Sequence, residues 1–255
     1  DHCYGLPGIL ASAGMGGRKT PLTIVAPAGI KAWLEATCEA TQLCLPFALE
    51  FIDSDELPSV EFESIAVTTF RLSHRAPSYA YGFTETKVDA ALDVDKLAQK
   101  GIPRGPLWGQ LKQGLDVEFE GERLKSHDFL IFKHKPRKVV IAGDNDQPDL
   151  LFDACAGAQV LVHEATYTEE MAQKAGDVGH SYAKLVAAFA ESVQLPNLVL
   201  THFSPRYQFH PHASPSIEDI RQEAQHVYSG SLYLARDFGE YTLDKAGRFA
   251  EVPGE

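Results

Sequence analysis

An α/β fold is predicted for this chain by two features of its sequence. Short, continuously apolar runs of the kind that form buried strands alternate with stretches in which apolar residues recur at helical spacing. Several of these runs end on His or Asp, at the point where a side chain can leave the sheet and enter a site. The length of 255 residues suits one large domain, so we expect a single domain over residues 1–255.

The N-terminal third predicts one β-α step followed by further strands. The run PLTIVA at 21–26 is typical of a short strand, and residues 29–41 follow it with the apolar spacing of a helix. Segments 47–53 and 60–72 are then expected to be successive strands, separated by polar and proline-containing turns. The second of these leads into His74, which places a histidine where the chain leaves the sheet.

The segment from about 86 to 126 differs in character and is predicted to be an inserted arm. A short helical pattern at 94–100 leads into GIPRGPLWGQLKQG, which is rich in Gly, Pro and Lys. Such a composition offers little apolar surface to bury against the rest of the protein. We therefore expect the arm to project from the body and to be mobile.

Three buried strands are expected in the C-terminal half, with a helix over 181–192 between the last two. They are KVVIA at 138–142, AQVLV at 158–162 and the apolar residues 198–200. Each is followed by a residue that can bind a metal or carry a proton, and these residues are Asp144, His163 and His202. The three side chains are expected at corresponding ends of neighbouring strands.

The composition limits the classes of function. No apolar run approaches the length of a membrane span and no signal peptide opens the chain, so we expect a cytoplasmic protein that does not associate with a membrane. The four cysteines lie apart without a C-x-x-C pair, which indicates reduced thiols. Because the formal net charge is −12, any contact with a phosphate backbone must come from a local basic patch.

The imidazole and carboxylate groups near the strand ends predict a metal site. These are the ligands that suit zinc and similar divalent ions. A single histidine after a strand is more often structural, so the prediction depends on the whole set. That set consists of Asp1, His2, His74, Asp144, His163, His180 and His202.

A series of motifs along the chain resembles the ribonuclease Z family of tRNA 3′-endonucleases. The series is DH followed by YGLPGIL, then SHRAPSYAYGF, GPLWGQL, VVIAGDN, VHEAT, GHSYA and THFSPRY, and it covers essentially the whole sequence. The resemblance implies the metallo-β-lactamase fold, a four-layer αββα sandwich with an inserted exosite arm. It also implies a zinc-dependent endoribonuclease that removes the 3′ trailer of precursor tRNA by metal-assisted hydrolysis, working as a homodimer.

The resemblance further implies two divalent metal ions, with zinc favoured. Asp144 resembles the aspartate that bridges both ions, His74 resembles a ligand of the first, and His202 resembles the last ligand of the second. Asp1 and His2 resemble the last two residues of an H-x-H-x-D-H motif, and Asp1 also resembles the residue that takes a proton from the attacking water. The H-x-H pair is absent from the sequence, so the first metal site is expected to be incomplete.

The remaining site residues are expected around these ligands. His163 resembles the histidine that protonates the leaving oxygen, while Glu164 and His180 are expected to orient the ligands from behind. Substrate phosphates are expected to meet Ser204 and Arg206 beside the site, and Gly105, Pro106 and Lys112 on the arm, where Lys96, Lys100 and Arg104 add positive charge.

Two other hypotheses remain open. A different hydrolase of the same fold, acting on a small ester, lactone or cyclic phosphodiester, is favoured by the net charge and by GDNDQ in place of the commoner GDT. A truncated, inactive subunit that binds RNA or a partner without cleaving is supported only by the missing H-x-H pair. The Gly-Pro arm favours the tRNA hypothesis over both.

Overall fold

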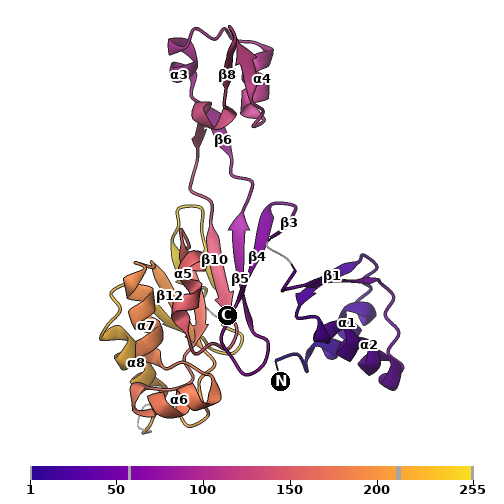
Figure 1. Ribbon diagram of the computed structural model, residues 1–255, viewed down its shortest axis with the longest axis vertical. Helices are drawn as coiled ribbons and strands as arrows, with labels where there is room; N and C mark the ends of the chain where they lie inside the picture. Colours follow the sequence, from indigo (N-terminus) through magenta and orange to yellow (C-terminus); the bar gives the residue numbers. More distant parts are fainter. Residues whose placement is uncertain (1, 57–58, 211–213, 254–255) are drawn as a thin grey trace.

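The computed structural model describes residues 2–56, 59–210 and 214–253. Figure 1 shows three parts: a body built on a large sheet, a smaller N-terminal unit beside it, and an arm that rises from the body and ends in a separate head. Within the described ranges, no helix has both the length and the apolar character needed to cross a membrane.

The body is organised by a seven-stranded sheet in the order β13-β12-β11-β10-β5-β4-β3. Its strands are β3 (Val60–Phe62), β4 (Ile65–Arg71), β5 (Tyr79–Glu85), β10 (Lys138–Ala142), β11 (Val160–Glu164), β12 (Asn197–Thr201) and β13 (Ser231–Leu234). The four strands β10 to β13 pair in parallel, whereas β10, β5, β4 and β3 pair antiparallel. The segments that follow β4, β10, β11 and β12 therefore meet at one edge of the sheet, as the sequence predicted.

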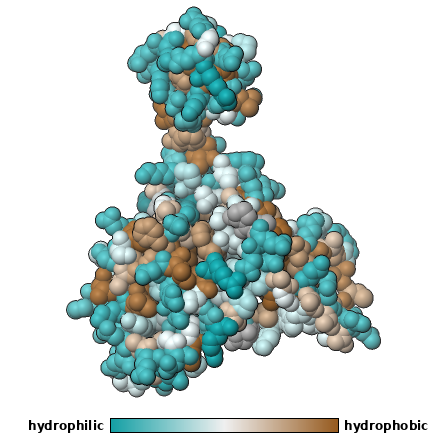
Figure 2. Space-filling model, in the orientation of Figure 1, coloured by the Kyte–Doolittle hydropathy of each residue, from teal (hydrophilic) through white to brown (hydrophobic). Residues whose placement is uncertain are grey.

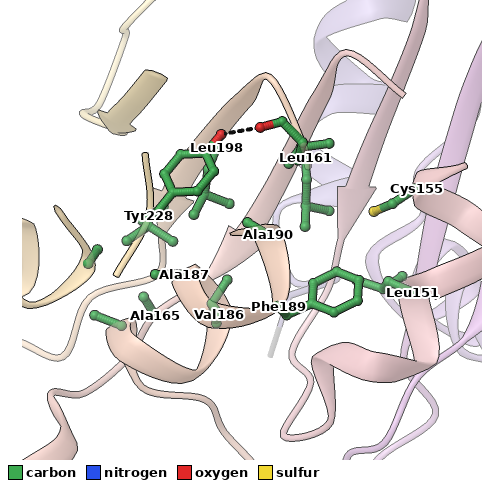
Figure 3. Close-up of a cluster of buried hydrophobic side chains, with 14 of the residues drawn as sticks. Leu151, Cys155, Leu161, Ala165, Val186, Ala187, Phe189, Ala190, Leu198 and Tyr228 are labelled. Atoms are coloured by element: carbon green, nitrogen blue, oxygen red, sulfur yellow. Dashed lines mark hydrogen bonds between the residues drawn. The ribbon is translucent and has the colours of Figure 1, made fainter. Parts of the chain in front are cut away.

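Helices cover one face of this sheet and enclose the main core. They are α5 (Phe152–Cys155), α6 (Ala172–Val178), α7 (Ala183–Ser192) and α8 (Ile217–Gln225), with 3₁₀ turns η2 (Pro148–Leu151) and η3 (Glu169–Met171). Figure 3 shows Val186 and Phe189 of α7 against Leu161 of β11 and Leu198 of β12, and all four are buried. The hairpin of β14 (Tyr241–Leu243) and β15 (Phe249–Glu251) follows the last strand of the sheet.

The N-terminal unit has a core of its own. It consists of α1 (Leu6–Met15), β1 (Leu22–Ala26), α2 (Gly29–Thr41) and β2 (Leu49–Asp53), so the predicted β-α step is present. Strands β1 and β2 pair in parallel, and the buried core of the unit consists of Leu10 of α1, Leu34 of α2 and Phe47. Helices thus pack on one face of the seven-stranded sheet and on one face of the β1-β2 sheet. These two helix–sheet pairs are the components of an αββα arrangement.

One predicted strand, 60–72, is divided in the structure. Strands β3 and β4 form a tight antiparallel hairpin in which Phe62 pairs with Ile65. The turn between them places Glu63 in the left-handed region with φ of 48°, a conformation that a continuous strand cannot contain. The polar pair Glu63-Ser64 was the available sequence signal for this turn.

The arm leaves the body after β5 and returns at β10. Strands β6 (Ala90–Leu92) and β9 (Leu130–Phe132) pair antiparallel, and beyond them lie α3 (Val94–Gln99), α4 (Pro106–Lys112), β7 (Val117–Phe119), β8 (Glu122–Leu124) and η1 (Ser126–Phe129). The segment 86–126 lies within this excursion, which continues to Arg137. The surface of the head is mainly hydrophilic in Figure 2, with apolar patches on the stalk below it.

The head of the arm has a hydrophobic core of its own, which the sequence analysis did not predict. The head buries a cluster made of Leu97, Ile102, Leu111, Val117, Leu124 and Phe129. These apolar residues are spaced irregularly along the sequence and pack only against one another and their neighbours in the head. The sequence pattern therefore did not reveal this small core, which is separate from the core of the body.

Loss of one side chain from that core is expected to loosen the head alone. Leu111 is fully buried, and its replacement by alanine removes contacts worth about 2–5 kcal/mol. Hydrogen exchange followed by mass spectrometry should show faster exchange in peptides from 90–132 and unchanged exchange in β10, β11 and β12. Equal acceleration in the sheet would show that head and body unfold as one unit.

Candidate metal centre

Three histidines and one aspartate converge where the strands end. The Nε2 atom of His2 lies 3.2 Å from one carboxylate oxygen of Asp144, and Nε2 of His74 lies 3.7 Å from the same oxygen. On the other oxygen, Nε2 of His202 lies at 3.6 Å. Asp1 lies outside the described residues. The structure therefore brings together every predicted metal ligand that it describes.

The spacing of these atoms fits a divalent metal ion. Two ligand atoms that each lie about 2 Å from a tetrahedral ion are about 3.3 Å apart. The observed separations of 3.2–3.7 Å bracket that value, and the ligand atoms of His2, Asp144 and His202 all lie within 4.8 Å of one another. The same limit holds for His74, Asp144 and His180. Imidazole nitrogens around a carboxylate are a donor set that zinc accepts.

Hydrogen bonds orient the ligand histidines so that Nε2 faces the cluster. His74 donates from Nδ1 to the carbonyl oxygen of Gly179 at 2.7 Å, because a carbonyl can only accept. Nδ1 of His202 lies 2.9 Å from Oγ1 of Thr166, whose own proton goes to the Glu164 carboxylate at 2.7 Å. Both rings therefore carry their proton on Nδ1 and offer the Nε2 lone pair to a metal.

Two backbone features make this arrangement possible. Gly179 ends α6 with φ of +76°, and a Cβ there would meet Nδ1 of His74 at 3.0 Å. His202 follows β12 with φ of 58°, a conformation that non-glycine residues rarely adopt, and its side chain turns toward Asp144. Such backbone strain is concentrated at functional sites.

Glu164 is a buried carboxylate that connects the parts of the site. It is only 1% exposed and accepts hydrogen bonds from the backbone of Asn145, Thr166 and Ser181 and from the side chains of Thr166 and His180. Burial alone would raise the pKa of Glu164, but the hydrogen bonds from His180 and Thr166 outweigh it and hold the pKa below its ordinary value. Glu164 is therefore an ionised anchor.

His180 lies within the cluster rather than behind it. Its ring centroid is 5.1 Å from that of His74 and 5.2 Å from that of His202. Nδ1 is 3.1 Å from Glu164, and this hydrogen bond raises the pKa of His180 above its ordinary value. His180 therefore lies beside the candidate ligands, whereas the sequence analysis expected it to orient them from behind.

His163 does not reach the cluster. Along β11 successive side chains point to opposite faces, so His163 shares the helix-covered face with Leu161, and Glu164 points to the other face. The ring of His163 is fully buried and is bonded to the Asn145 side chain and the Glu164 carbonyl. In this position it cannot touch a leaving group, because no part of the ring is exposed to the site.

The expected phosphate contacts are dispersed. Ser204 lines a cavity of about 800 Å³ beside His202, whereas the exposed Arg206 lies over the ring of Tyr167 and does not line that cavity. Gly105, Pro106 and Lys112 are exposed at the two ends of α4 on the head of the arm.

A second cavity, of about 680 Å³, is lined on one side by residues of the N-terminal unit and on the other by His74 and Asp144. Most of its lining is apolar.

Comparisons with known proteins relate the whole chain to one family and one fold. No model of a known protein family matches the sequence. Ribonuclease Z of Pseudomonas putida strain GB-1 is 48% identical over 248 residues, which cover 97% of this chain and 78% of the relative. The crystal structure of the short form of human tRNase Z aligns with 98% of this chain and 74% of its own, at a TM-score of 0.56 and 22% identity.

A further crystal structure identifies the fold. The metallo-β-lactamase fold protein YhfI of Bacillus subtilis aligns with 98% of this chain and 73% of its own, at a TM-score of 0.56 and 18% identity. The predicted metallo-β-lactamase fold is thus confirmed, and its inserted segment between β5 and β10 is the arm. At 48% identity over most of both proteins, the chain belongs to the ribonuclease Z family.

Proposed function

We propose that the protein is a zinc-dependent endoribonuclease that removes the 3′ trailer of precursor tRNA in the cytoplasm, as a homodimer. The observation that carries this proposal is the convergence of His2, His74 and His202 on the Asp144 carboxylate. Support also comes from relatives named Ribonuclease Z and from an arm that stands apart from the metal centre.

Two metal positions share Asp144 in this proposal. His2, Asp144 and His202 would bind one ion. His74 and Asp144 would supply two of the ligands of the other ion. Asp1, proposed as a further ligand and as the acceptor of a proton from water, lies outside the described residues. Divalent ions bound by these residues would lower the pKa of water and neutralise the charge that develops on a phosphate.

His180 is proposed as the group that protonates the leaving oxygen, in the role first assigned to His163. Its Nδ1 is fixed by Glu164, so Nε2 is left facing the ligand cluster. The hydrogen bond to Glu164 raises the pKa of His180 above its ordinary value, and a well-placed imidazole contributes about 10²–10⁴-fold to such a step. The carboxylate behind the ring also stabilises its charged form.

The arm is proposed to bind the RNA away from the scissile bond. Segment 86–137 holds ten of the 23 Lys and Arg residues but only eight of the 35 Asp and Glu residues, so it is weakly basic on a strongly acidic body. It leaves the sheet at the end opposite Asp144, because β10 begins at the arm and ends at the metal centre. This separation supports a homodimer in which the arm of one chain serves the site of its partner.

The cations on the head differ in their availability. Lys100 pairs with Glu122, and Lys96 donates to the backbone carbonyl of Asp128. The guanidinium of Arg104 lies over the Trp108 ring without an acidic partner among the described residues, and Lys112 is exposed. Arg104 and Lys112 are therefore the better placed of these cations to meet phosphates.

A matched pair of double variants tests this role of the arm. Arg104→Ala/Lys112→Ala should weaken cleavage of precursor tRNA and lower the slope of log affinity against log salt by about one for each lost contact. Lys96→Ala/Lys100→Ala removes the same charge and should change the slope less. Hydrolysis of bis(p-nitrophenyl) phosphate should be unchanged in both. Equal losses on both substrates would reject the assignment of the arm to RNA binding.

One observation supports the alternative that the protein hydrolyses a small substrate. The cavity of about 680 Å³ opens beside His74 and Asp144 and is lined by apolar side chains such as Leu6, Ile9 and Ile24. A hydrolase acting on a small ester or phosphodiester would use such a cavity and would not need the arm. Insensitivity of precursor-tRNA cleavage to the Arg104 and Lys112 substitutions, with rapid hydrolysis of small substrates, would favour this alternative.

A further inference from the structure

Asn145 occupies the centre of the hydrogen-bond network behind the metal centre. It follows Asp144 directly and is fully buried. Its side-chain oxygen accepts from the backbone amides of Ser73 at 3.2 Å and Gln147 at 3.3 Å. Its backbone donates to Glu164 at 3.3 Å and accepts from the Ser181 hydroxyl at 2.6 Å. One residue thus contacts segments adjoining His74, Asp144 and His180.

The direction of these hydrogen bonds fixes the orientation of the Asn145 amide. Two backbone N–H groups point at its oxygen, so a flipped amide would place its NH₂ group against two donors. The NH₂ group must therefore face Nε2 of His163, which lies 3.0 Å away. This contact needs a lone pair on Nε2.

The other side of the His163 ring supplies that lone pair. Nδ1 lies 2.7 Å from the carbonyl oxygen of Glu164, which can only accept, so the ring carries its proton on Nδ1. Complete burial also lowers the pKa of His163 and favours the neutral ring. The buried His163 therefore has one tautomer that satisfies both neighbours, and Asn145 has one orientation.

We propose that Asn145 and His163 form a buried positioning pair in which the Nδ1-protonated ring fixes the Asn145 amide and so holds the loops of His74, Asp144 and His180 at the spacing of a metal centre. This role rests on the metal centre proposed above. In this role, the fully buried His163 does not need to touch the substrate. Residues that support metal ligands in this way typically change metal affinity by about 10–100-fold.

The tautomer is tested directly by ¹⁵N NMR of histidine-labelled protein. The expected spectrum has one ring, absent in His163→Gln, that is protonated on Nδ1 and unprotonated on Nε2 at neutral pH. A proton on Nε2 of His163 would overturn the proposal. This measurement depends neither on zinc nor on RNA cleavage, so it is independent of the proposed function.

Zinc affinity, measured by competition with a chromophoric chelator, tests the positioning role. Glutamine at 163 places an acceptor near the position of Nε2, whereas leucine has similar size and no acceptor. His163→Gln should stay within about 3-fold of the original affinity, and His163→Leu should lose about 10–100-fold. Equal affinities of the two variants would overturn the role of the hydrogen bond.

Asn145→Asp keeps the test decisive if the leucine variant fails to fold. The aspartate has the same shape and can still accept from Ser73 and Gln147, but it cannot donate to His163. We expect the same loss of about 10–100-fold in zinc affinity, with circular dichroism unchanged. Unchanged affinity would contradict the proposal. Failure of the unsubstituted protein to bind zinc would instead reject the proposed function.

Discussion

Cleavage of precursor tRNA by an Asp144→Ala variant is expected to fall by at least about 10³-fold, together with loss of bound metal. Asp144 is the one carboxylate, within the described residues, that lies within 3.7 Å of ring nitrogens of His2, His74 and His202. Without it these nitrogens share no anion among the described residues, and each proposed metal position loses a ligand. Metal content by elemental analysis, measured beside single-turnover rates, checks both losses.

Asp149→Ala is the matched control for this substitution. Asp149 is an exposed carboxylate five positions along the same segment, in the 3₁₀ turn η2. Its replacement makes the same change of charge and should leave metal content and rate unchanged. An Asp144→Ala protein with a full complement of metal would show that the ions are held elsewhere.

His180→Ala is expected to keep its metal yet cleave precursor tRNA about 10²–10⁴-fold more slowly. The proposed task of His180 is to deliver a proton to the leaving ribose oxygen, which departs poorly as an alkoxide. Bis(p-nitrophenyl) phosphate releases a stable phenolate that does not need the proton. The variant should therefore lose much less activity on this substrate, and the ratio of the two losses is the quantity to measure.

Metal analysis separates this role from a ligand role. The ligand atoms of His74, Asp144 and His180 lie within 4.8 Å of one another, so His180 is close enough to coordinate an ion. If His180→Ala loses metal as completely as Asp144→Ala, then His180 is a ligand. Similar losses of rate on both phosphodiesters would lead to the same conclusion.

Strand order explains why much of the site was visible in the sequence. Apolar runs at 138–142 and 198–200 could be recognised by composition, and parallel pairing then forces the residues that follow them to one edge of the sheet. The convergence of Asp144 and His202 at this edge was predicted in this way. His74 was found from the polar end of β4, which pairs antiparallel with β5 at the same edge.

The face of the sheet to which His163 points and the hydrogen bond from His74 to Gly179 were not predicted, because neither follows from the local sequence pattern. His163 and Glu164 are adjacent in sequence, and a shift of one residue in a strand exchanges the two faces of the sheet. The predicted strand ended at 162, but β11 continues to Glu164 and buries His163 beneath the helices. The carbonyl of Gly179 supports His74 from 105 positions away, and no local pattern reveals such a contact.

The separate core of the head has a consequence for how the chain folds. Contacts within the head join residues that are close in sequence, whereas the antiparallel pair of β5 and β10 must close a loop across the whole arm. Closing that loop carries an entropic cost that grows with its length. When the head has formed, β6 and β9 already hold the two ends of the arm together. The pairing of β5 with β10 then becomes nearly local, so an insertion between two strands of the central sheet need not slow the assembly of that sheet.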